Sequence, residues 1–480
     1  MTSTATPLVE RLAGHHVLVL NWRDVRHPQA GGAEQYMHRI ARRWVAAGVR
    51  VTWFCARPEG LAAHEVIDGI EIERCGGELS LYAHVAARLA RRGREFDAIV
   101  DCQNGIPFFA PAFAGDVPVV GVVHHVHQDQ FATRFPAPVA AVGRLLEGRV
   151  ARRVHGTRRI AAVSPSTRQE LRRRLGFPGP IAIVPNGAAA PAAPTTPRDV
   201  DPTIALVTRL VPHKRVDVLL RAVAEVARRV PRLRVDVVGD GPERAALTAL
   251  VAELGLERTV TLHGFQPDAV RDEILGRAWL TTSTSDAEGW GCSVIEAAGH
   301  GLPTVALDAA GIRDSVVDGV TGRLVGSAAE LPDALVTALG ELADDDHAAA
   351  VEAACRRWAG SFSWDRSADL LAGVVLAEMA DGRARERADR TARSDLATVV
   401  RLRGVDAGAV RAALRSTDQV VEEGDELAVL LVGCDEVDAL AVLDRLGLAP
   451  VELRIAERRD LLAGPARRRA VEPAAVATRG

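Results

Sequence analysis

The sequence predicts an α/β protein with two parallel-sheet domains, followed by a small α+β domain. Short apolar runs that end in polar residues alternate with amphipathic segments, which is the pattern of βαβ units. This pattern stops at residues 188–202, a segment rich in Pro and Ala, and then restarts, so we expect an interdomain linker there. With 480 residues, 48% of them hydrophobic, the chain is long enough for several domains with real cores.

Residues 1–190 are expected to form the first domain. A glycine-bearing loop (27–34) precedes a helix that is expected to run through Trp44. Buried strands are expected at 15–22, 49–55, 96–104, 117–125, 158–166 and 180–187. Ligands of parallel sheets bind beyond the carboxyl ends of the strands, and polar residues fall at four of these ends. They are Asn104, His124, Ser164 and Asn186.

Residues 203–360 are expected to form the second domain, with a helix that begins near Cys292. Its strands are expected at 203–210, 233–241, 259–265, 278–285 and 303–308. A further helix is expected at 361–379, within a crossover segment at 361–380.

The remaining residues are expected to form a third unit. A charged stretch at 381–394 is expected to be structureless. The order strand, helix, hairpin, helix, strand over 395–460 predicts a ferredoxin-like appendage. Residues 463–480 are rich in Ala, Arg and Pro, so we expect a disordered tail.

Composition indicates a cytoplasmic protein. No apolar run approaches the ~18–20 uninterrupted residues of a membrane helix, and no secretory signal is evident. The six cysteines are scattered without a CxxC pair, as expected of reduced core residues.

The net charge of −3 conceals a basic first half. Residues 1–190 carry 24 arginines against 16 acidic residues, which suggests an anionic partner: a membrane surface or a phosphorylated acceptor rather than nucleic acid. Segment 149–174 holds nine arginines and one acidic residue, Glu170. Either this segment contacts the inner face of the membrane peripherally, or it is a solvated helix surface.

The segment TSDAEGWGCSVIEAAGHG (284–301) is the most informative in the chain. Glu288 lies in the loop before the helix expected from Cys292, and Glu296 lies on that helix. The small residues between them leave backbone amides open at a helix N-terminus, where phosphate groups bind. Glutamates beside a phosphate site suit the hydroxyls of a ribose or a sugar. Taken alone, the two glutamates would more simply be a helix-capping pair.

Two cations follow the first strand of the second domain. Arg209 lies at the strand end, and Lys214 follows five residues later as the only lysine among 59 basic residues. A position that retains Lys where Arg is used everywhere else points to a need for a compact ammonium. Together the two cations could neutralise a diphosphate leaving group without a metal.

These motifs resemble those of the family 4 retaining glycosyltransferases. The resemblance covers residues 15–380. It includes GGAE (31–34), His124, PNG (185–187), Arg209 with Lys214, VGDGPE (238–243), HGF (263–265), EGWGCSVIEA (288–297) and FSWD (362–365). It implies the GT-B fold, in which two Rossmann-like domains face each other across a cleft and the last helix crosses back to the first domain.

The resemblance also implies roles for single residues. Arg209 and Lys214 would hold the diphosphate of a UDP- or GDP-sugar, Glu296 the ribose and Glu288 the transferred sugar. Amides near Gly291 and Cys292 would touch the donor, and Gly264 with Phe265 would frame the base. Gly31 and Gly32 would approach the phosphates, and His124 would lie near the reacting sugar. The reaction would be a metal-independent front-face substitution that retains the anomeric configuration, without a cofactor, onto a sugar or lipid-linked acceptor.

Other interpretations remain open. A PLP-dependent glycan phosphorylase shares the fold and needs a lysine, a nucleotide-sugar epimerase shares it too, and a nucleotide-sugar sensor would bind the donor without turnover. The cluster HHVH (124–127) could be misread as a zinc site, but we expect one functional histidine, His124, with solvated neighbours. The apolar stretch 104–113 lines an acceptor site or is a buried connection.

Overall fold

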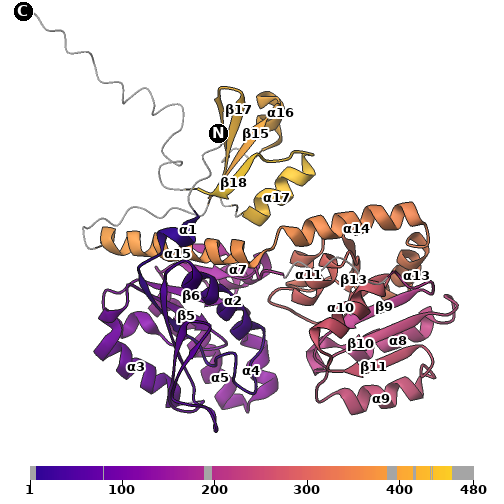
Figure 1. The fold of residues 1–480 in the computed structure, drawn as a ribbon, viewed down its shortest axis with the longest axis horizontal. Coiled ribbons are helices and arrows are strands. Elements are labelled where there is room, and N and C mark those ends of the chain that lie inside the picture. Colours follow the sequence, from indigo (N-terminus) through magenta and orange to yellow (C-terminus); the bar gives the residue numbers. More distant parts are fainter. Residues whose placement is uncertain are drawn as a thin grey trace, which may run out of the picture.

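The computed structural model describes residues 7–456 apart from 79, 189–196, 386–396, 415–417, 433 and 435. The described residues form three separate sheets, and each sheet packs against its own helices (Figure 1). Most of the linker expected at 188–202 and the whole tail expected at 463–480 lie outside the described residues.

The first sheet has the strand order β3-β4-β2-β1-β5-β6-β7-β8, and all its pairings are parallel except β3 with β4. Its central strands are buried along their length because helices cover both faces. The strands are β1 (His16–Leu20), β2 (Arg50–Cys55), β3 (His64–Ile67), β4 (Ile70–Arg74), β5 (Ala98–Gln103), β6 (Val119–Val123), β7 (Ile160–Ala162) and β8 (Ile181–Ile183). The helices are α1 (Leu8–Arg11), α2 (Gly32–Ala46), α3 (Ser80–Arg92), α4 (Gln128–Arg134), α5 (Ala137–Leu145), α6 (Ala151–His155) and α7 (Pro165–Arg173).

The hairpin β3–β4 was not expected from the sequence. It turns at Asp68 and Gly69, whose φ angles are 50° and 80°. An Asp-Gly pair between two short apolar-alternating runs is a strong signal for a two-residue hairpin turn. The sequence therefore carries a local signal for this hairpin.

The second sheet is parallel throughout, with the order β11-β10-β9-β12-β13-β14. Its strands are β9 (Thr203–Val207), β10 (Arg234–Val238), β11 (Val260–Gly264), β12 (Leu280–Ser283), β13 (Thr304–Leu307) and β14 (Gly322–Val325). The helices are α8 (Val216–Val226), α9 (Arg244–Glu253), α10 (Asp268–Arg277), α11 (Cys292–Gly299), α12 (Ile312–Ser315), α13 (Leu331–Glu341) and α14 (Asp345–Gly360). These two sheets are the cores of the two Rossmann-like domains of the GT-B fold, as the sequence predicted. The edge strand β14 and the helices α10, α12, α13 and α14 were not predicted individually.

Helix α15 (Trp364–Arg385) crosses back and packs on the first domain (Figure 1). The indole Nε1 of Trp44 donates a hydrogen bond of 2.9 Å to the carbonyl of Ala368. The helix continues beyond its expected end, so the structureless segment expected at 381–394 is wrong for 381–385. An ion pair of 2.8 Å between Arg159 and Asp381 ties this end of the helix to the first domain.

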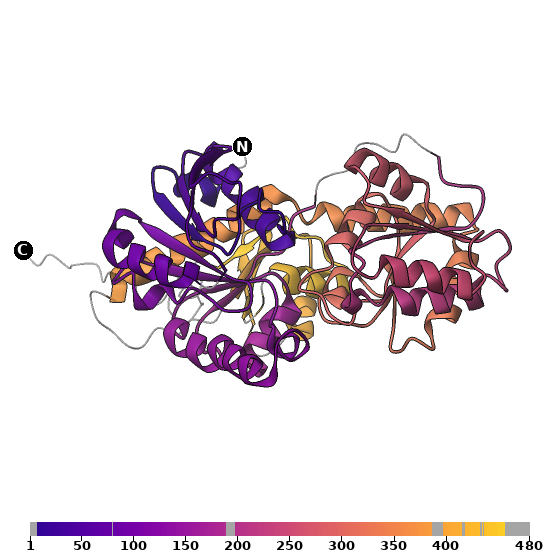
Figure 2. The ribbon, with the colours of Figure 1, turned by 90° about the horizontal axis from the view of Figure 1, so that it is seen from below.

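The two chain crossings between the domains lie side by side. The amide of Ala188 donates to the carbonyl of Phe362 at 2.7 Å, where the chain leaves the first domain and returns to it. A Cβ on Gly187 would lie 2.4 Å from the backbone nitrogen of Trp364, so only glycine allows this close approach. Figure 2 shows the two domains side by side with this junction between them.

The third sheet has the order β16-β17-β15-β18, fully antiparallel. Its elements are β15 (Ala397–Arg403), α16 (Ala407–Ala413), β16 (Gln419–Glu423), β17 (Glu426–Val432), α17 (Glu436–Arg445) and β18 (Glu452–Ile455). This order and connectivity are ferredoxin-like, as expected. Helix α17 contacts the first domain through Arg168–Asp438 and contacts α15 through Arg366–Glu436.

Candidate active site

The candidate site lies where the carboxyl ends of the first two sheets face each other. His124 directly follows β6, and Gly289 belongs to the loop between β12 and α11. A Cβ on Gly289 would lie 2.1 Å from the carbonyl oxygen of His124, so the two domains touch here backbone to backbone. The hydroxyl of Thr167 lies 3.4 Å from both the His124 and the Gly289 carbonyl oxygens.

Lys214 and Glu288 form an ion pair at this edge. Lys214 ends a short 3₁₀ turn (Pro212–Lys214) after β9, and its Nζ donates to Oε1 of Glu288. The same carboxylate oxygen accepts a hydrogen bond of 2.8 Å from the hydroxyl of Ser285. Both charged side chains are largely buried, so each depends on the other for its charge to be tolerated.

Arg209 differs from Lys214. It is exposed and makes no side-chain hydrogen bond or ion pair with any residue that the structure describes. Its guanidinium is therefore available to an anion from solution. Of the two residues expected to bind the diphosphate, Lys214 is thus ion-paired within the protein, whereas Arg209 is not paired with any described residue.

The N-terminus of α11 carries two more of the expected residues. Gly291 precedes the helix, and a Cβ there would lie 2.3 Å from the hydroxyl of Ser315, so this glycine is required by packing as well as for open amides. The side-chain amide of Asn186 donates to Sγ of Cys292 at 3.1 Å across the domain junction. Burial raises the pKa of the Cys292 thiol to about 12, so it stays protonated and is not a nucleophile.

Glu296 lies on the same helix and is half-buried. Burial raises the pKa of its carboxyl group, and the charge of Arg271 opposes this effect. A carboxylate held in this way would gain from hydroxyl donors supplied by a ligand.

Within the described residues, the imidazole of His124 has a nitrogen without a hydrogen-bond partner. Its Nε2 is buried without one among the described residues, and its ring packs edge-on against Tyr36 at a centroid distance of 4.8 Å. Burial lowers the pKa of His124 to about 4, and the charge of His127 adds to this effect. A neutral imidazole with an orphaned nitrogen is suited to a hydrogen bond with a bound ligand.

The expectation that the other histidines of HHVH are solvated was wrong for His125. Burial also lowers the pKa of His125 to about 4. The backbone amide of His127 donates to the buried carboxylate of Glu147 at 2.6 Å. Packing that is not visible in the sequence desolvates the His125 imidazole, while the His127 side chain is 25% exposed.

The glycines at the start of α2 leave room for a ligand. The amide of Gly31 donates to the buried carboxylate of Glu34 at 2.7 Å. A Cβ added to Gly32 would meet nothing within 4 Å. The protein itself therefore does not require glycine at position 32.

The loop after β11 presents an exposed aromatic residue. Gly264 has a φ of +72°, and a Cβ there would lie 2.5 Å from a guanidinium nitrogen of Arg244. The following residue, Phe265, is 81% exposed. An aromatic ring so exposed without a partner can stack on a planar ligand.

Asn21 is a polar residue of this region that the sequence analysis missed. It follows β1 and is fully buried, and its Oδ1 accepts a hydrogen bond of 2.7 Å from the amide of Asn104. Its own Nδ2 has no partner among the described residues. The only signal in the sequence was its place directly after an apolar strand.

Most of the apolar stretch 104–113 is a buried connection, but Phe113 at its end is 42% exposed. Its Phe108 is buried and stacks on Tyr82, and the amides of Phe108 and Ala110 donate to the carboxylate of Asp101 at 2.9 and 3.1 Å. This burial favours the buried connection over an acceptor-lining segment at Phe108 and Ala110.

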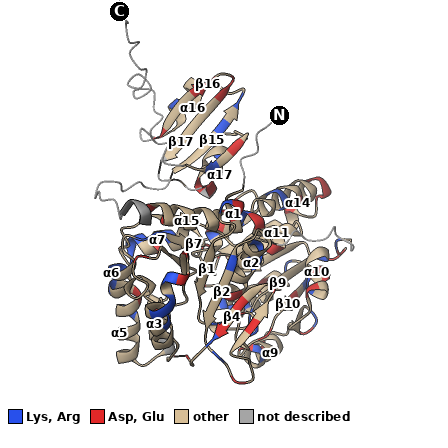
Figure 3. Ribbon diagram, turned by 60° about the vertical axis from the view of Figure 1, so that its left-hand side comes forward, with Lys and Arg blue, Asp and Glu red and all other residues tan. Residues whose placement is uncertain are grey.

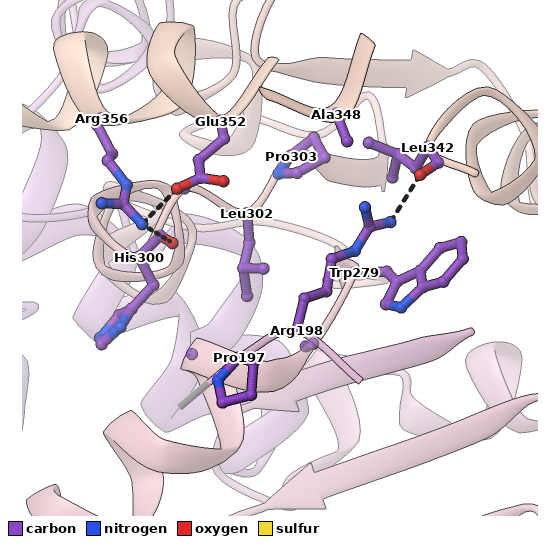
Figure 4. Close-up of a pocket in the computed structure, with 13 residues that line it drawn as sticks. Pro197, Arg198, Trp279, His300, Leu302, Pro303, Leu342, Ala348, Glu352 and Arg356 are labelled. Carbon is purple, nitrogen blue, oxygen red and sulfur yellow. Dashed lines mark hydrogen bonds and ion pairs between the residues drawn. The ribbon is translucent and has the colours of Figure 1, made fainter. Parts of the chain in front are cut away.

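A cavity of about 320 Å³ lies away from this region, at the amino ends of β12 and β13. Figure 4 shows the Arg198 guanidinium beside the ring of Trp279, which it overlies at 3.8 Å, and the Arg356–Glu352 pair on the other side of Leu302. The Arg356–Glu352 pair is neutral, Arg198 donates to the carbonyl of Leu342 at 2.9 Å, and the strands separate the cavity from the candidate site.

The described residues contain neither a metal-binding cluster nor a membrane-spanning helix. They contain no group of three or more His, Cys, Asp or Glu side chains that could hold a metal ion. No helix among them is long and apolar enough to cross a bilayer.

Two family models match the chain. Residues 30–190 match "Glycosyltransferase Family 4", and residues 193–358 match "Glycosyl transferases group 1".

Curated relatives that match part of this chain are also named as glycosyltransferases. The GDP-mannose-dependent alpha-(1-6)-phosphatidylinositol monomannoside mannosyltransferase of Mycolicibacterium smegmatis is 33% identical over 39% of this chain and 49% of its own length. The D-inositol 3-phosphate glycosyltransferase of Nocardia farcinica is 35% identical over 39% of this chain and 46% of its own. The chain thus spans about half the length of these relatives.

The fold is also that of solved structures. Sucrose-phosphate synthase from Thermosynechococcus elongatus superposes with a TM-score of 0.61 at 20% identity, over 78% of this chain and 100% of that one.

Proposed function

The chain belongs to the family 4 glycosyltransferases, and we propose that it transfers a sugar from a nucleotide diphosphate sugar to a hydroxyl acceptor with retention of configuration. The observation that carries this proposal is the meeting of Lys214 and Glu288 at the carboxyl edge of the second sheet, opposite His124 of the first. A cation, a carboxylate and a neutral imidazole at one domain junction fit a donor that carries both phosphates and hydroxyls.

Each residue then has a part in the proposed reaction. Arg209 binds the diphosphate first, because its guanidinium is free. Lys214 turns from Glu288 to the diphosphate, which leaves the Glu288 carboxylate to accept hydrogen bonds from sugar hydroxyls. Glu296 accepts hydrogen bonds from the ribose, and the α11 amides near Gly291 and Cys292 add positive dipole to the phosphate site.

The remaining residues complete the donor site. Gly31 and Gly32 allow the phosphates to approach α2, while Gly264 and Phe265 frame the base. His124 hydrogen-bonds the transferred sugar through its free Nε2. Stabilisation of the leaving diphosphate by fixed cations is the main source of acceleration, without metal or cofactor.

The named relatives suggest donor and acceptor classes to test. One is GDP-mannose-dependent and acts on a phosphatidylinositol mannoside, and another is named for D-inositol 3-phosphate. We extend these to a UDP- or GDP-sugar donor and a phosphorylated or lipid-linked polyol acceptor at a cytoplasmic membrane face.

A thermal-shift panel tests the donor class. UDP, GDP, ADP, TDP and their sugar conjugates are added in the presence of a chelator, and a ligand at 100 times its Kd adds about 2.7 kcal/mol of stability. We expect one diphosphate to respond selectively, and NMR of the product to show a retained anomeric centre. Absence of any response, or bound PLP in the absorbance spectrum, would contradict the proposal.

A further inference from the structure

Helix α5 presents its large apolar side chains to solvent. Val139, Val142 and Leu145 are 52%, 55% and 47% exposed, at a spacing of three residues that keeps them on one side of the helix. The inward residues are Ala140 and Gly143, both buried. A surface helix of a globular domain ordinarily has the opposite arrangement.

Packing fixes this orientation of α5. A Cβ on Gly143 would lie 2.6 Å from the ring of Phe131 in α4, so the inner face has room for small side chains only. The valines and the leucine therefore cannot rotate inward. Phe135, in the turn before α5, adds a further aromatic side chain that is 41% exposed.

Four arginines without ion-pair partners among the described residues lie on α5 and directly after it. Arg144 lies on α5, and Arg149, Arg152 and Arg153 follow on the next helical turns. None of the four forms an ion pair within the described part of the chain. Glu147, the acidic residue between them, is fully buried and bound to the amides of His127 and Gln128. Figure 3 shows α5 at the outer edge of the first domain, next to α6.

The Arg-rich segment 149–174 thus divides into two parts. Its later arginines are engaged within the protein, in the pairs Arg158–Glu378, Arg159–Asp381, Arg168–Asp438 and Arg174–Glu170. Only its beginning adjoins the exposed apolar face of α5. Within the described residues of this region, exposed apolar side chains and unpaired arginines therefore occur together only at residues 135–153. A membrane contact is supported there and not along the rest of the Arg-rich segment.

We propose that α5 and the arginines at 144–153 dock on an anionic lipid bilayer. A helix whose exposed apolar side chains are flanked by cations lies in the bilayer interface, where the apolar groups enter the acyl boundary and the cations meet lipid phosphates. The inference deepens the proposed function, on which it rests for its purpose. Helix α4, which packs against α5, begins directly after His127, so the proposed docking surface and the His124 side of the candidate site are joined by a single helix.

Charge argues against a second copy of the chain as the occupant. In a two-fold contact the same patch meets itself, so the four arginines of each copy would face the like charges of the other without acidic partners. An anionic bilayer supplies the missing negative charge.

Vesicle sedimentation tests the proposal. Purified full-length protein is mixed with vesicles of phosphatidylcholine alone or with added phosphatidylglycerol, at low and high salt. We expect binding only to the anionic vesicles and weaker binding at high salt. The triple change Val139→Gln, Val142→Gln and Leu145→Gln should weaken binding at least about tenfold, because each lost apolar contact reduces interfacial affinity.

Two controls keep the result specific. Val66→Gln with Val320→Gln changes equally exposed valines elsewhere on the surface and should leave binding unchanged. Arg149→Gln with Arg152→Gln and Arg153→Gln should weaken binding and reduce its salt dependence without touching α5 packing. The donor thermal shift, measured on every variant, reports whether the proposed transferase site is intact.

The proposal would be overturned if the wild-type protein did not bind anionic vesicles. It would also be overturned if the variant with all three glutamine substitutions sedimented with vesicles as the wild type does. If the donor shift persists in either case, the proposed function stands. Self-association that the triple abolishes, with no vesicle binding, would assign the patch to a second copy and also overturn the proposal.

Discussion

Lys214 and Glu288, 74 residues apart in the chain, neutralise each other at the edge of the second sheet. Both residues are expected to bind the donor, yet in this structure they bind each other. The donor must therefore exchange one ion pair for another, which keeps the buried charges compensated before and after binding.

Lys214→Ala should reduce kcat at least about 100-fold, because the leaving diphosphate loses a fixed cation. It should also lower stability by about 1–3 kcal/mol, since the largely buried Glu288 carboxylate loses its partner. Nucleotide release and thermal unfolding measure the two effects. Adding Glu288→Gln should restore stability but not turnover, while the exposed Arg221→Ala on α8 should change neither. Normal turnover by Lys214→Ala would remove Lys214 from the mechanism.

Glu296→Gln should raise the stability of the protein and weaken its affinity for nucleotide. Burial raises the pKa of this carboxyl group in the folded state, so folding is favoured where the group is protonated and disfavoured as pH rises through the folded pKa. The amide should therefore stabilise the protein at neutral pH while weakening nucleotide affinity about tenfold. Melting curves from pH 4 to 8 and calorimetric titration with UDP or GDP measure both, with Glu253→Gln as an exposed control. Unchanged nucleotide affinity would exclude a ribose contact.

His124 and His125 should make the protein acid-sensitive. Both have a pKa of about 4 in the folded state, below the ordinary value of 6.5, so their neutral forms contribute stability above pH 6.5 that is lost as pH falls towards 4. The loss is at most about 3 kcal/mol for each histidine. His125→Gln should flatten the unfolding free energy between pH 6.5 and 4 and keep donor turnover, whereas His124→Gln should flatten it and lose turnover. Identical pH profiles for wild type and both variants would show that neither group titrates in this range.

Two glycine substitutions should have opposite consequences. Gly32→Ala has open space around its new Cβ, so stability should be preserved, but the methyl group should obstruct donor phosphates and weaken donor binding. Gly187→Ala would place its Cβ 2.4 Å from the Trp364 nitrogen and should destabilise the domain junction. Thermal unfolding with and without nucleotide distinguishes the two. Full donor affinity in Gly32→Ala would place the phosphates elsewhere.

Features that are local in the sequence were the ones that could be predicted. The start of α11 at Cys292 and the strand-end position of His124 follow from neighbouring residues alone. The Lys214–Glu288 pair and the Asn21–Asn104 bond join residues 74 and 83 positions apart, so only the folded chain reveals them. The outward valines of α5 could not be foreseen either, because an apolar helix in a sequence is ordinarily assigned to the core. The hairpin at Asp68–Gly69, in contrast, could be predicted from its neighbouring residues.

The return of α15 to the first domain has a consequence for synthesis on the ribosome. The core of that domain includes Ala368, Leu371 and Val375, whereas its first strand ends at Leu20. The first domain therefore stays incomplete until residues beyond 375 have emerged. The second domain has a core of its own between Ile204 and Leu342, so it is complete earlier. The part translated first is thus the part that finishes folding later, and a chain truncated after residue 360 should protect the second domain from protease but not the first.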